Sequence, residues 1–147
     1  MDNKLESKTR LTAIQLVSQQ LVNNQDIESI KDDFDKHYRN TIIDNSSNKV
    51  QYNVNFLSKL ANYFKTINIK NVSEEINKLI KFNRKYEKWD TINKAIILTA
   101  LAELRNSGEN KIKIILNDYI EISKSFVNSQ ETKMINAILD KMINEKK

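Results

Sequence analysis

Residues 89–104 read WDTINKAIILTALAEL and contain the longest apolar run of the chain, from Ala95 to Ala102. Asp90 is suited to be the N-cap of a helix from Thr91 to Leu104, because its carboxylate can accept hydrogen bonds from the first backbone N–H groups. A helix that is apolar on nearly every side must be enclosed by other elements. The sequence therefore predicts a central helix around which the rest of the chain packs.

The residues after this stretch predict where the central helix ends. Arg105 carries a positive charge at the negative end of the helix dipole, which stabilises a helix terminus. Asn106, Ser107 and Gly108 follow, and they favour a turn. Gly108 is the only glycine in the chain, so we expect it to take the left-handed conformation that often ends a helix.

Length and composition favour a single all-α domain over residues 1–147. The chain has no proline and one glycine, so it has little material for the tight turns of a β-protein. A chain of 147 residues can bury about two thirds of the surface that its unfolded form exposes, and it needs no disulfide or metal to fold. The absence of cysteine excludes disulfides and thiolate chemistry.

The sequence predicts neither secretion nor insertion into a membrane. The first ten residues, MDNKLESKTR, lack the apolar segment of a secretion signal. The longest apolar run is far shorter than the roughly 20 residues of a membrane-spanning helix. We therefore expect a soluble cytoplasmic protein that does not enter a membrane.

Apolar residues recur with helical spacing outside the central stretch as well. The predicted helices span residues 5–22, 27–38, 50–67, 72–88, 91–104, 112–126 and 129–142. We expect Ser46, Ser47 or Asn48 to cap the third of these helices and Ser129 to cap the last. The polar stretch 39–49 is predicted to be a loop within one domain.

Aromatic and amide side chains among the apolar residues are expected to be buried. The aromatic residues expected in the core or at its edge are Tyr63, Tyr86, Trp89 and Tyr119. Asn117 and Asn136 are expected to be buried amides with hydrogen-bond partners, since a buried amide normally has one.

Charge is unevenly distributed along the chain, whose net charge is +5. Residues 26–44 are rich in acids, whereas residues 65–88 are rich in bases. If residues 72–88 form one helix, four of its lysines fall within an arc of about 80° opposite the apolar side. These lysines are Lys78, Lys81, Lys85 and Lys88, with Arg84 beside them. Such a stripe can bind nucleic-acid phosphates, although a basic helix face is often only a solvated surface.

Several motifs, taken in order, resemble the family of NusB transcription antitermination factors. Residues 10–15, RLTAIQ, are similar to the family's Arg-x-x-Ala-hydrophobic-Gln in the first helix. Residues 94–98, KAIIL, and 102–104, AEL, resemble its central helix. Residues 115–126, ILNDYIEISKSF, resemble its helix with Asn-Glu and a later Lys-x-Phe. Residues 135–140, INAILD, are similar to its final Asn-x-hydrophobic-Leu-Asp, so the resemblance covers essentially the whole chain.

The resemblance implies an all-α domain of about seven helices in two packed bundles and a role that is not enzymatic. Proteins of this family pair with the small-subunit ribosomal protein that acts as NusE, and together they bind boxA RNA in nascent ribosomal RNA transcripts. In this antitermination complex they help RNA polymerase to read through terminators. No cofactor is implied, and His37, the only histidine, predicts no metal site. Whether the chain is a monomer or a homodimer stays open.

The resemblance and the basic stripe together mark candidate site residues. The candidates for RNA contact are Lys4, Lys8, Arg10, Gln15, Lys81, Arg84, Lys85, Lys94 and Lys133. Glu87 is the candidate for contact with the ribosomal protein. Lysines and arginines can neutralise RNA phosphates, and binding then weakens as the salt concentration rises. For each of these residues the alternative is a solvated side chain with no ligand.

Two other functions stay open. In one, the chain is a protein-protein scaffold of the same complex with little direct sequence-specific RNA binding, because Asp2 and Glu6 offset the few bases at the start of the first helix. In the other it is an enzyme such as an RNA methyltransferase, in which a similar helical domain is fused to a catalytic one. The sequence offers no Gly-rich cofactor loop, no cysteine and no Ser/His arrangement for such an activity.

Overall fold

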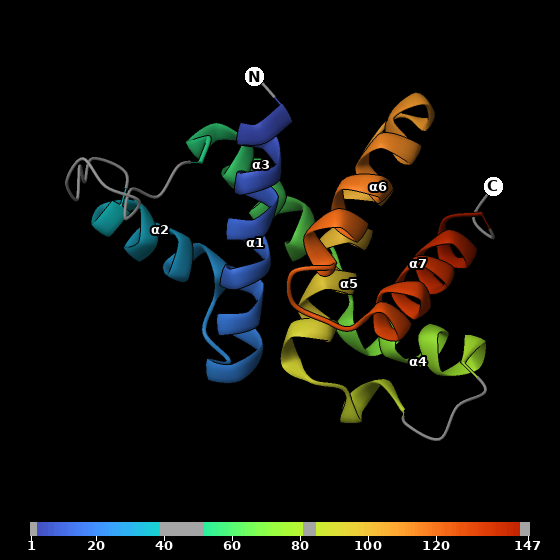
Figure 1. Ribbon diagram of the computed structural model, residues 1–147. Helices are drawn as coiled ribbons and strands as arrows, with labels where there is room; N and C mark the ends of the chain where they lie inside the picture. The colour runs from blue at the N-terminus through green and yellow to red at the C-terminus, as the bar shows by residue number, and fades with distance from the viewer. Residues whose placement is uncertain (1–2, 39–51, 81–84, 145–147) are drawn as a thin grey trace.

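A computed structural model describes residues 3–38, 52–80 and 85–144, which Figure 1 shows as a set of packed helices. In this part of the chain every regular element is a helix, which confirms the predicted all-α class. The α-helices are α1 (Asn3–Asn23), α2 (Ile27–Tyr38), α3 (Val54–Lys65), α4 (Ile69–Leu79), α5 (Thr91–Arg105), α6 (Ile112–Ser123) and α7 (Ser129–Asn144). Two short 3-10 helices, η1 (Tyr86–Lys88) and η2 (Glu109–Lys111), precede α5 and α6. None of the described helices is long and apolar enough to cross a membrane.

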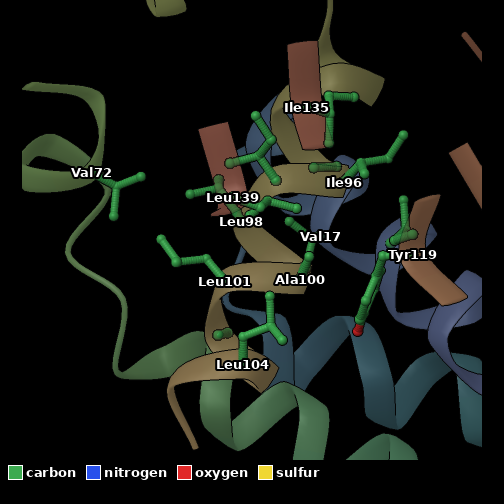
Figure 2. Packing of buried hydrophobic residues seen from close by; sticks show 14 of the residues in the cluster. Val17, Val72, Ile96, Leu98, Ala100, Leu101, Leu104, Tyr119, Ile135 and Leu139 are labelled. Carbon is green, nitrogen blue, oxygen red and sulfur yellow. The ribbon is translucent and has the colours of Figure 1, made fainter. Parts of the chain in front are cut away.

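Helix α5 lies at the centre of the fold, as its apolar residues predict. It contacts α1, α3, α6 and α7, and every residue from Ala95 to Leu104 is buried. Figure 2 shows Leu98 and Ala100 of α5 in one cluster with Leu139 of α7 and Val17 of α1. Because α5 is buried on all sides, the helices around it share one core.

The other helices form two groups, one on each side of α5 (Figure 1). Helices α1, α2 and α3 contact one another and enclose a smaller apolar cluster. This cluster consists of Ala13, Leu16, Ile30, Leu57 and Leu60. In the other group α6 packs against α7, and α4 contacts η1. The arrangement agrees with the prediction of two packed bundles.

Most predicted helix boundaries agree with the structure. Helix α2 covers the predicted residues 27–38, and α1, α5 and α7 differ from the prediction by no more than two residues at either end. Helix α1 ends at Asn23, one residue after the predicted end at Val22. Asn24 then takes a left-handed conformation with a φ of 57°, and its N–H donates to the carbonyl of Gln20 at 2.7 Å.

Helices α3 and α4 begin at residues other than those predicted, at Val54 instead of residue 50 and at Ile69 instead of residue 72. The side chain of Asn53 caps α3 by accepting a hydrogen bond from the N–H of Phe56 at 2.9 Å. The predicted caps 46–48 lie outside the described residues. Helix α4 begins three residues before the predicted Val72, because the side chain of Asn68 accepts from the backbone and caps it there. A single asparagine is thus enough to begin each helix.

The cap of α7 is Asn128 rather than the predicted Ser129. The side chain of Asn128 accepts a hydrogen bond from the N–H of Glu131 at 2.8 Å. The carboxylate of Glu131 accepts one from the N–H of Asn128 at 3.3 Å. This reciprocal pair satisfies two backbone donors at once, which explains why the helix begins after Asn128.

The predicted helix over residues 72–88 is wrong in its second half. Helix α4 covers only its first half, and the chain resumes after the undescribed residues 81–84 as η1. The N–H of Tyr86 donates to Oδ1 of Asn77 at 2.9 Å, which ties η1 back to α4. Tyr86 and Trp89 are buried, with ring centroids 5.2 Å apart. Burial of both rings requires the chain to turn back toward the core.

Gly108 does not have the predicted left-handed conformation. Its φ is −72°, which any residue can adopt, and it precedes η2. Helix α5 ends at Arg105, and the side-chain amide of its C-cap Asn106 donates to the carbonyl of Ala102 at 2.8 Å. Asn106 thus satisfies one of the last unpaired carbonyls of the helix, so no left-handed residue is needed there.

The predicted burial is confirmed for the aromatic residues and is wrong for the two amides. Tyr86, Trp89 and Tyr119 are buried, and Tyr63 is partly buried against the core. Asn117 and Asn136 are exposed on α6 and α7. Phe126, the last residue of the predicted helix 112–126, lies beyond the end of α6 and is exposed. Neighbours in sequence point to different sides of a helix, so apolar neighbours do not imply burial.

A buried arginine joins three helices of the two groups. Arg10 of α1 is only 5% exposed. Its Nε and Nη2 donate to the carboxylate of Glu103 in α5, at 2.9 and 2.7 Å. Its Nη1 donates to the carboxylate of Asp118 in α6 at 2.7 Å. We call Arg10, Glu103 and Asp118 the arginine clamp, and its hydrogen bonds fix the rotation of α1 against α5 and α6.

Two further side chains complete the arginine clamp. The hydroxyl of Tyr119 donates to Glu103 at 2.7 Å, and the hydroxyl of Ser7 donates to Asp118 at 2.5 Å. Burial raises the pKa of Tyr119 well above its usual value, and the Glu103 carboxylate adds to this. Burial, the largest single effect, would lower the pKa of Arg10, but its hydrogen bonds and charge interactions with Glu103 and Asp118 together outweigh it and raise the pKa. The guanidinium therefore stays charged and the phenol stays a donor.

Replacing Ile97 by Ala removes a side chain that is fully buried in α5. We expect the free energy of unfolding to fall by about 2–5 kcal/mol, because transfer free energy is lost and a cavity is left. Urea denaturation followed by circular dichroism measures the change. Val22→Ala is the control, since Val22 is 69% exposed, and its effect should stay within about 0.5 kcal/mol. Equal effects of the two substitutions would contradict the central position of α5.

Replacing Arg10 by Met leaves the buried Glu103 without its cation. We expect the free energy of unfolding to fall by about 3–5 kcal/mol, because an uncompensated buried charge is costly. In the double variant with Glu103→Gln the loss should be smaller than the sum of the two single losses, because the two side chains interact directly. A double-mutant cycle from urea denaturation measures this coupling. Strictly additive losses would mean that the arginine clamp does not act as a unit.

Candidate functional site

Helix α1 has an exposed face that carries three of the predicted RNA-contact residues. Lys4, Lys8 and Gln15 are all exposed, and a rotation of about 100° per residue places them within an arc of about 40°. Gln19 and Val22 continue this exposed side toward the end of α1. We call Lys4, Lys8 and Gln15 the α1 face. It presents two ammonium groups and one amide along one side of a straight helix.

Arg10 lies on a different side of α1 from these residues. The sequence places it among the RNA contacts, but the structure buries it and directs its N–H groups to Glu103 and Asp118. Its role is therefore structural, in place of the predicted phosphate contact. The arginine clamp pairs residues 93 and 108 positions apart, and no local spacing in the sequence indicates such a pairing.

A second set of candidates meets where η1 leads into α5. Lys94 lies in the first turns of α5, and its Nζ donates to the backbone carbonyl of Glu87 at 2.9 Å. The same Nζ stands 5.7 Å from the ring centroid of Tyr86. Lys85 is exposed directly before η1. We call Lys85, Glu87 and Lys94 the η1 corner, in which Lys94 is a partly buried structural contact.

Glu87 is exposed, but its carboxylate is held in place. It accepts hydrogen bonds from the hydroxyl of Ser73 and, at 2.9 Å, from the amide of Asn77, both in α4. The bond from Ser73 lowers the pKa of Glu87, so the carboxylate keeps its charge. Ser73 and Asn77 are not among the site residues predicted from the sequence. Their spacing of four residues, which puts them on one side of a helix, is the signal that could have found them.

The remaining candidates lie apart or outside the described chain. Lys133 is exposed on α7, where it lines a groove of about 520 Å³. The apolar residues of this groove are Leu79, Ile80, Met134, Ala137 and Ile138. Lys81 and Arg84 lie outside the described residues, and Lys78 is in α4 while Lys85 and Lys88 are not. The predicted stripe on one helix face is therefore not formed, because α4 ends too early.

The α1 face and the η1 corner lie at opposite ends of α5. Arg10 of α1 is bonded to Glu103, near the end of α5, whereas Lys94 is near the beginning of α5. A rise of about 1.5 Å per residue puts these two positions roughly 14 Å apart along the helix. Figure 1 likewise shows the start of α1 at the top and the beginning of α5 at the bottom. The candidates thus form two separate surfaces.

Two acidic residues of α2, Glu28 and Asp35, belong to ion pairs in the group of α1, α2 and α3. Lys65 of α3 pairs with Glu28 at 2.8 Å, and this bond lowers the pKa of Glu28. Lys31 pairs with Asp35 at 2.6 Å, and Tyr52 donates to the same carboxylate. Within the described ranges no three His, Cys, Asp or Glu side chains converge in a way that could hold a metal ion.

Comparison with known proteins identifies the family. The model of the NusB family matches residues 7–144. The transcription antitermination protein NusB of Rickettsia felis is 30% identical over 153 aligned residues, which cover 97% of this chain and 95% of that protein. The protein of the same name from Rickettsia akari is 30% identical over 154 residues, with 98% and 96% covered. Because the family model and these relatives match the sequence over nearly its full length, this chain belongs to the NusB family.

Proposed function

We propose that this protein is a transcription antitermination factor that acts as an RNA-binding adaptor and not as an enzyme. It pairs with the small-subunit ribosomal protein that acts as NusE, and the pair binds boxA RNA in nascent ribosomal RNA transcripts. Bound there, the complex promotes read-through of terminators by RNA polymerase. Membership of the NusB family supports this proposal, since the relatives are named transcription antitermination proteins.

The α1 face is the observation that carries the RNA part of the proposal. Lys4 and Lys8 present ammonium groups about one helical turn apart, and Gln15 adds an amide on the same side. Lysines neutralise phosphates without reading the base sequence. An amide can both donate and accept hydrogen bonds at a base edge or a ribose. The α1 face therefore offers groups for the backbone and for a base of a single strand.

We assign contact with the ribosomal protein to Glu87 of the η1 corner. The carboxylate of Glu87 is exposed and already oriented by Ser73 and Asn77, so it loses little conformational freedom on binding. A negative charge repels RNA phosphates but attracts a basic side chain of a protein. Lys133 and Lys85 remain candidates for RNA at this end of the molecule.

A protein-protein scaffold with little sequence-specific RNA binding is the second candidate function. The burial of Arg10 favours it, because the α1 face then has only two cations, Lys4 and Lys8. On this alternative the ribosomal protein supplies most of the RNA contacts. The pair would then bind boxA and a scrambled RNA with similar affinity, and the binding would depend on salt.

The double variant Lys4→Glu with Lys8→Glu tests the α1 face. We expect the affinity of the protein–partner pair for boxA RNA to fall at least about tenfold, because repulsion replaces two phosphate contacts. The slope of log K against log salt should become shallower by roughly 1.4, at about 0.7 per phosphate contact in a single strand. Fluorescence anisotropy of labelled boxA RNA, with a scrambled RNA beside it, measures both quantities.

The matched control is the double variant Lys36→Glu with Lys70→Glu, which makes the same charge change on exposed residues of α2 and α4. It should bind boxA RNA with nearly the affinity of the unchanged protein. If the two double variants lose affinity equally, total charge and not the α1 face governs RNA binding. If neither changes the affinity, the scaffold function is the better one.

Glu87→Lys tests the η1 corner. We expect the affinity for the ribosomal partner to fall at least about tenfold, because an oriented negative charge is replaced by a positive one. Isothermal titration calorimetry of the two proteins measures the change. Glu74→Lys, also exposed and in α4, is the control and should leave the affinity unchanged. Unchanged affinity in both variants would remove Glu87 from the partner surface.

A further inference from the structure

A cleft of about 560 Å³ opens between the start of α1, α3, the end of α5 and the start of α6. Asn3 and Glu6 line it from the side of α1 that faces away from the α1 face. Its walls and rim include Phe56, Lys59, Tyr63, Asn106, Lys111 and Ile114. None of these residues is among those predicted from the sequence to contact RNA or the ribosomal protein.

The floor of the cleft is the buried ion pair of Arg10 and Glu103. Their opposite charges offset each other, with Nη2 and Oε2 2.7 Å apart. Glu6 lies 3.6 Å from Nη1 of Arg10, which also pairs with Asp118, so the acids of this region face the arginine. Lys59 and Lys111 are the exposed cations of the lining, and their ammonium groups can pair with a phosphodiester.

The walls of the cleft offer surfaces for a flat ring. Phe56 and Tyr63 of α3 are each partly exposed, so part of both rings is accessible from the cleft. Phe56 is held in place by Arg10, whose Cζ lies 5.3 Å from the ring centroid. Ile114, at the start of α6, is 67% exposed although it is a large apolar side chain. A ring placed against these three residues would cover apolar surface that folding leaves in water.

The mouth of the cleft carries two amides and the only glycine. Asn106 and Asn110 are exposed, and an amide offers both donors and an acceptor at the edge of a base. One N–H of Asn106 donates to the carbonyl of Ala102, which leaves its second N–H and its oxygen for a ligand. A Cβ on Gly108 would stand 3.0 Å from Oδ1 of Asn110. Since the φ of Gly108 suits any residue, the backbone does not require glycine here. Its missing side chain instead leaves room beside the amide of Asn110.

We infer that this cleft binds one nucleotide of a single-stranded RNA, an inference that rests on the proposed RNA-binding function. The base packs against the two rings and Ile114, as bases stack on aromatic side chains in proteins that bind single strands. The two amides contact the edge of the base, and Lys59 and Lys111 hold the adjoining phosphate. A strand that reaches both the cleft and the α1 face bends around the start of α1.

Photo-cross-linking locates the bound base. Each uridine of a boxA-type RNA is replaced in turn by 4-thiouridine, and the RNA is irradiated with the full-length protein and its ribosomal partner. Mass spectrometry then identifies the cross-linked tryptic peptides. We expect cross-links in the peptides 50–59 and 60–65, which contain Phe56 and Tyr63. RNA binding with cross-links confined to α1 would overturn the cleft and leave the proposed RNA function intact.

The double variant Lys59→Glu with Ile114→Ser tests the same site by affinity. Both side chains are exposed, so the fold should be kept, which circular dichroism checks. We expect at least about tenfold weaker binding of boxA RNA by the pair and loss of the cleft cross-links. Gly108→Val, which fills the mouth of the cleft, should weaken the same cross-links. Lys36→Glu on α2 is the control for charge, and it should change neither the affinity for boxA RNA nor the cleft cross-links. Unchanged affinity in the double variant would overturn the inference.

Titration with a mononucleotide tests the cleft independently of the proposed RNA-binding function. Uridine 5′-monophosphate is titrated into methyl-labelled protein, and the δ1-methyl resonance of Ile114 is followed by NMR. A saturable shift at Ile114 supports the cleft even if the pair binds no boxA RNA, in which case only the proposed function fails. No shift at Ile114, together with no cleft cross-link, overturns the cleft whether or not RNA binds elsewhere.

Discussion

The guanidinium of Arg10, which is almost shielded from water, sets the arrangement of helices α1, α5 and α6. Because Arg10 is buried, its N–H groups need acceptors inside the protein, and Glu103 and Asp118 supply them from α5 and α6. The three helices are thereby held in one rotation and register. The rotation of α1 decides which of its residues face outward. Lys4 and Lys8 are exposed because Arg10, on another side of the same helix, must reach its carboxylates.

Apolar burial and the arginine clamp have different effects on the fold. The burial of α5 drives folding, but the hydrophobic effect has no direction and would tolerate several rotations of α1. Hydrogen bonds between charged groups are directional, so the clamp selects one rotation. Since α5 also begins at the η1 corner, it holds that corner and the α1 face at its two ends. Under the proposed function, the RNA contacts of the α1 face and the partner contact of Glu87 therefore lie toward opposite ends of α5.

The sequence predicts those features that depend on local patterns. Helices α2 and α5 begin where expected, because helical spacing and a long apolar run define them. The end of α4 at Leu79 is not predicted, and the burial of Tyr86 and Trp89 and the hydrogen bond from Tyr86 to Asn77 beyond it are tertiary contacts that periodicity cannot reveal. Within the candidate site, spacing alone places the α1 face on one side of a helix. Spacing cannot show that Arg10 is buried and has a structural role, because its partner Glu103 lies 93 positions away in the sequence.

Backbone amide chemical shifts test most directly whether RNA lies along α1. The isotope-labelled protein is studied in complex with the ribosomal partner, before and after addition of boxA RNA. We expect large changes at Lys4, Lys8 and Gln15 and little change along α2, because α2 has no place in the proposed RNA surface. Changes along α2 or α7 with none along α1 would contradict the RNA contact of the α1 face.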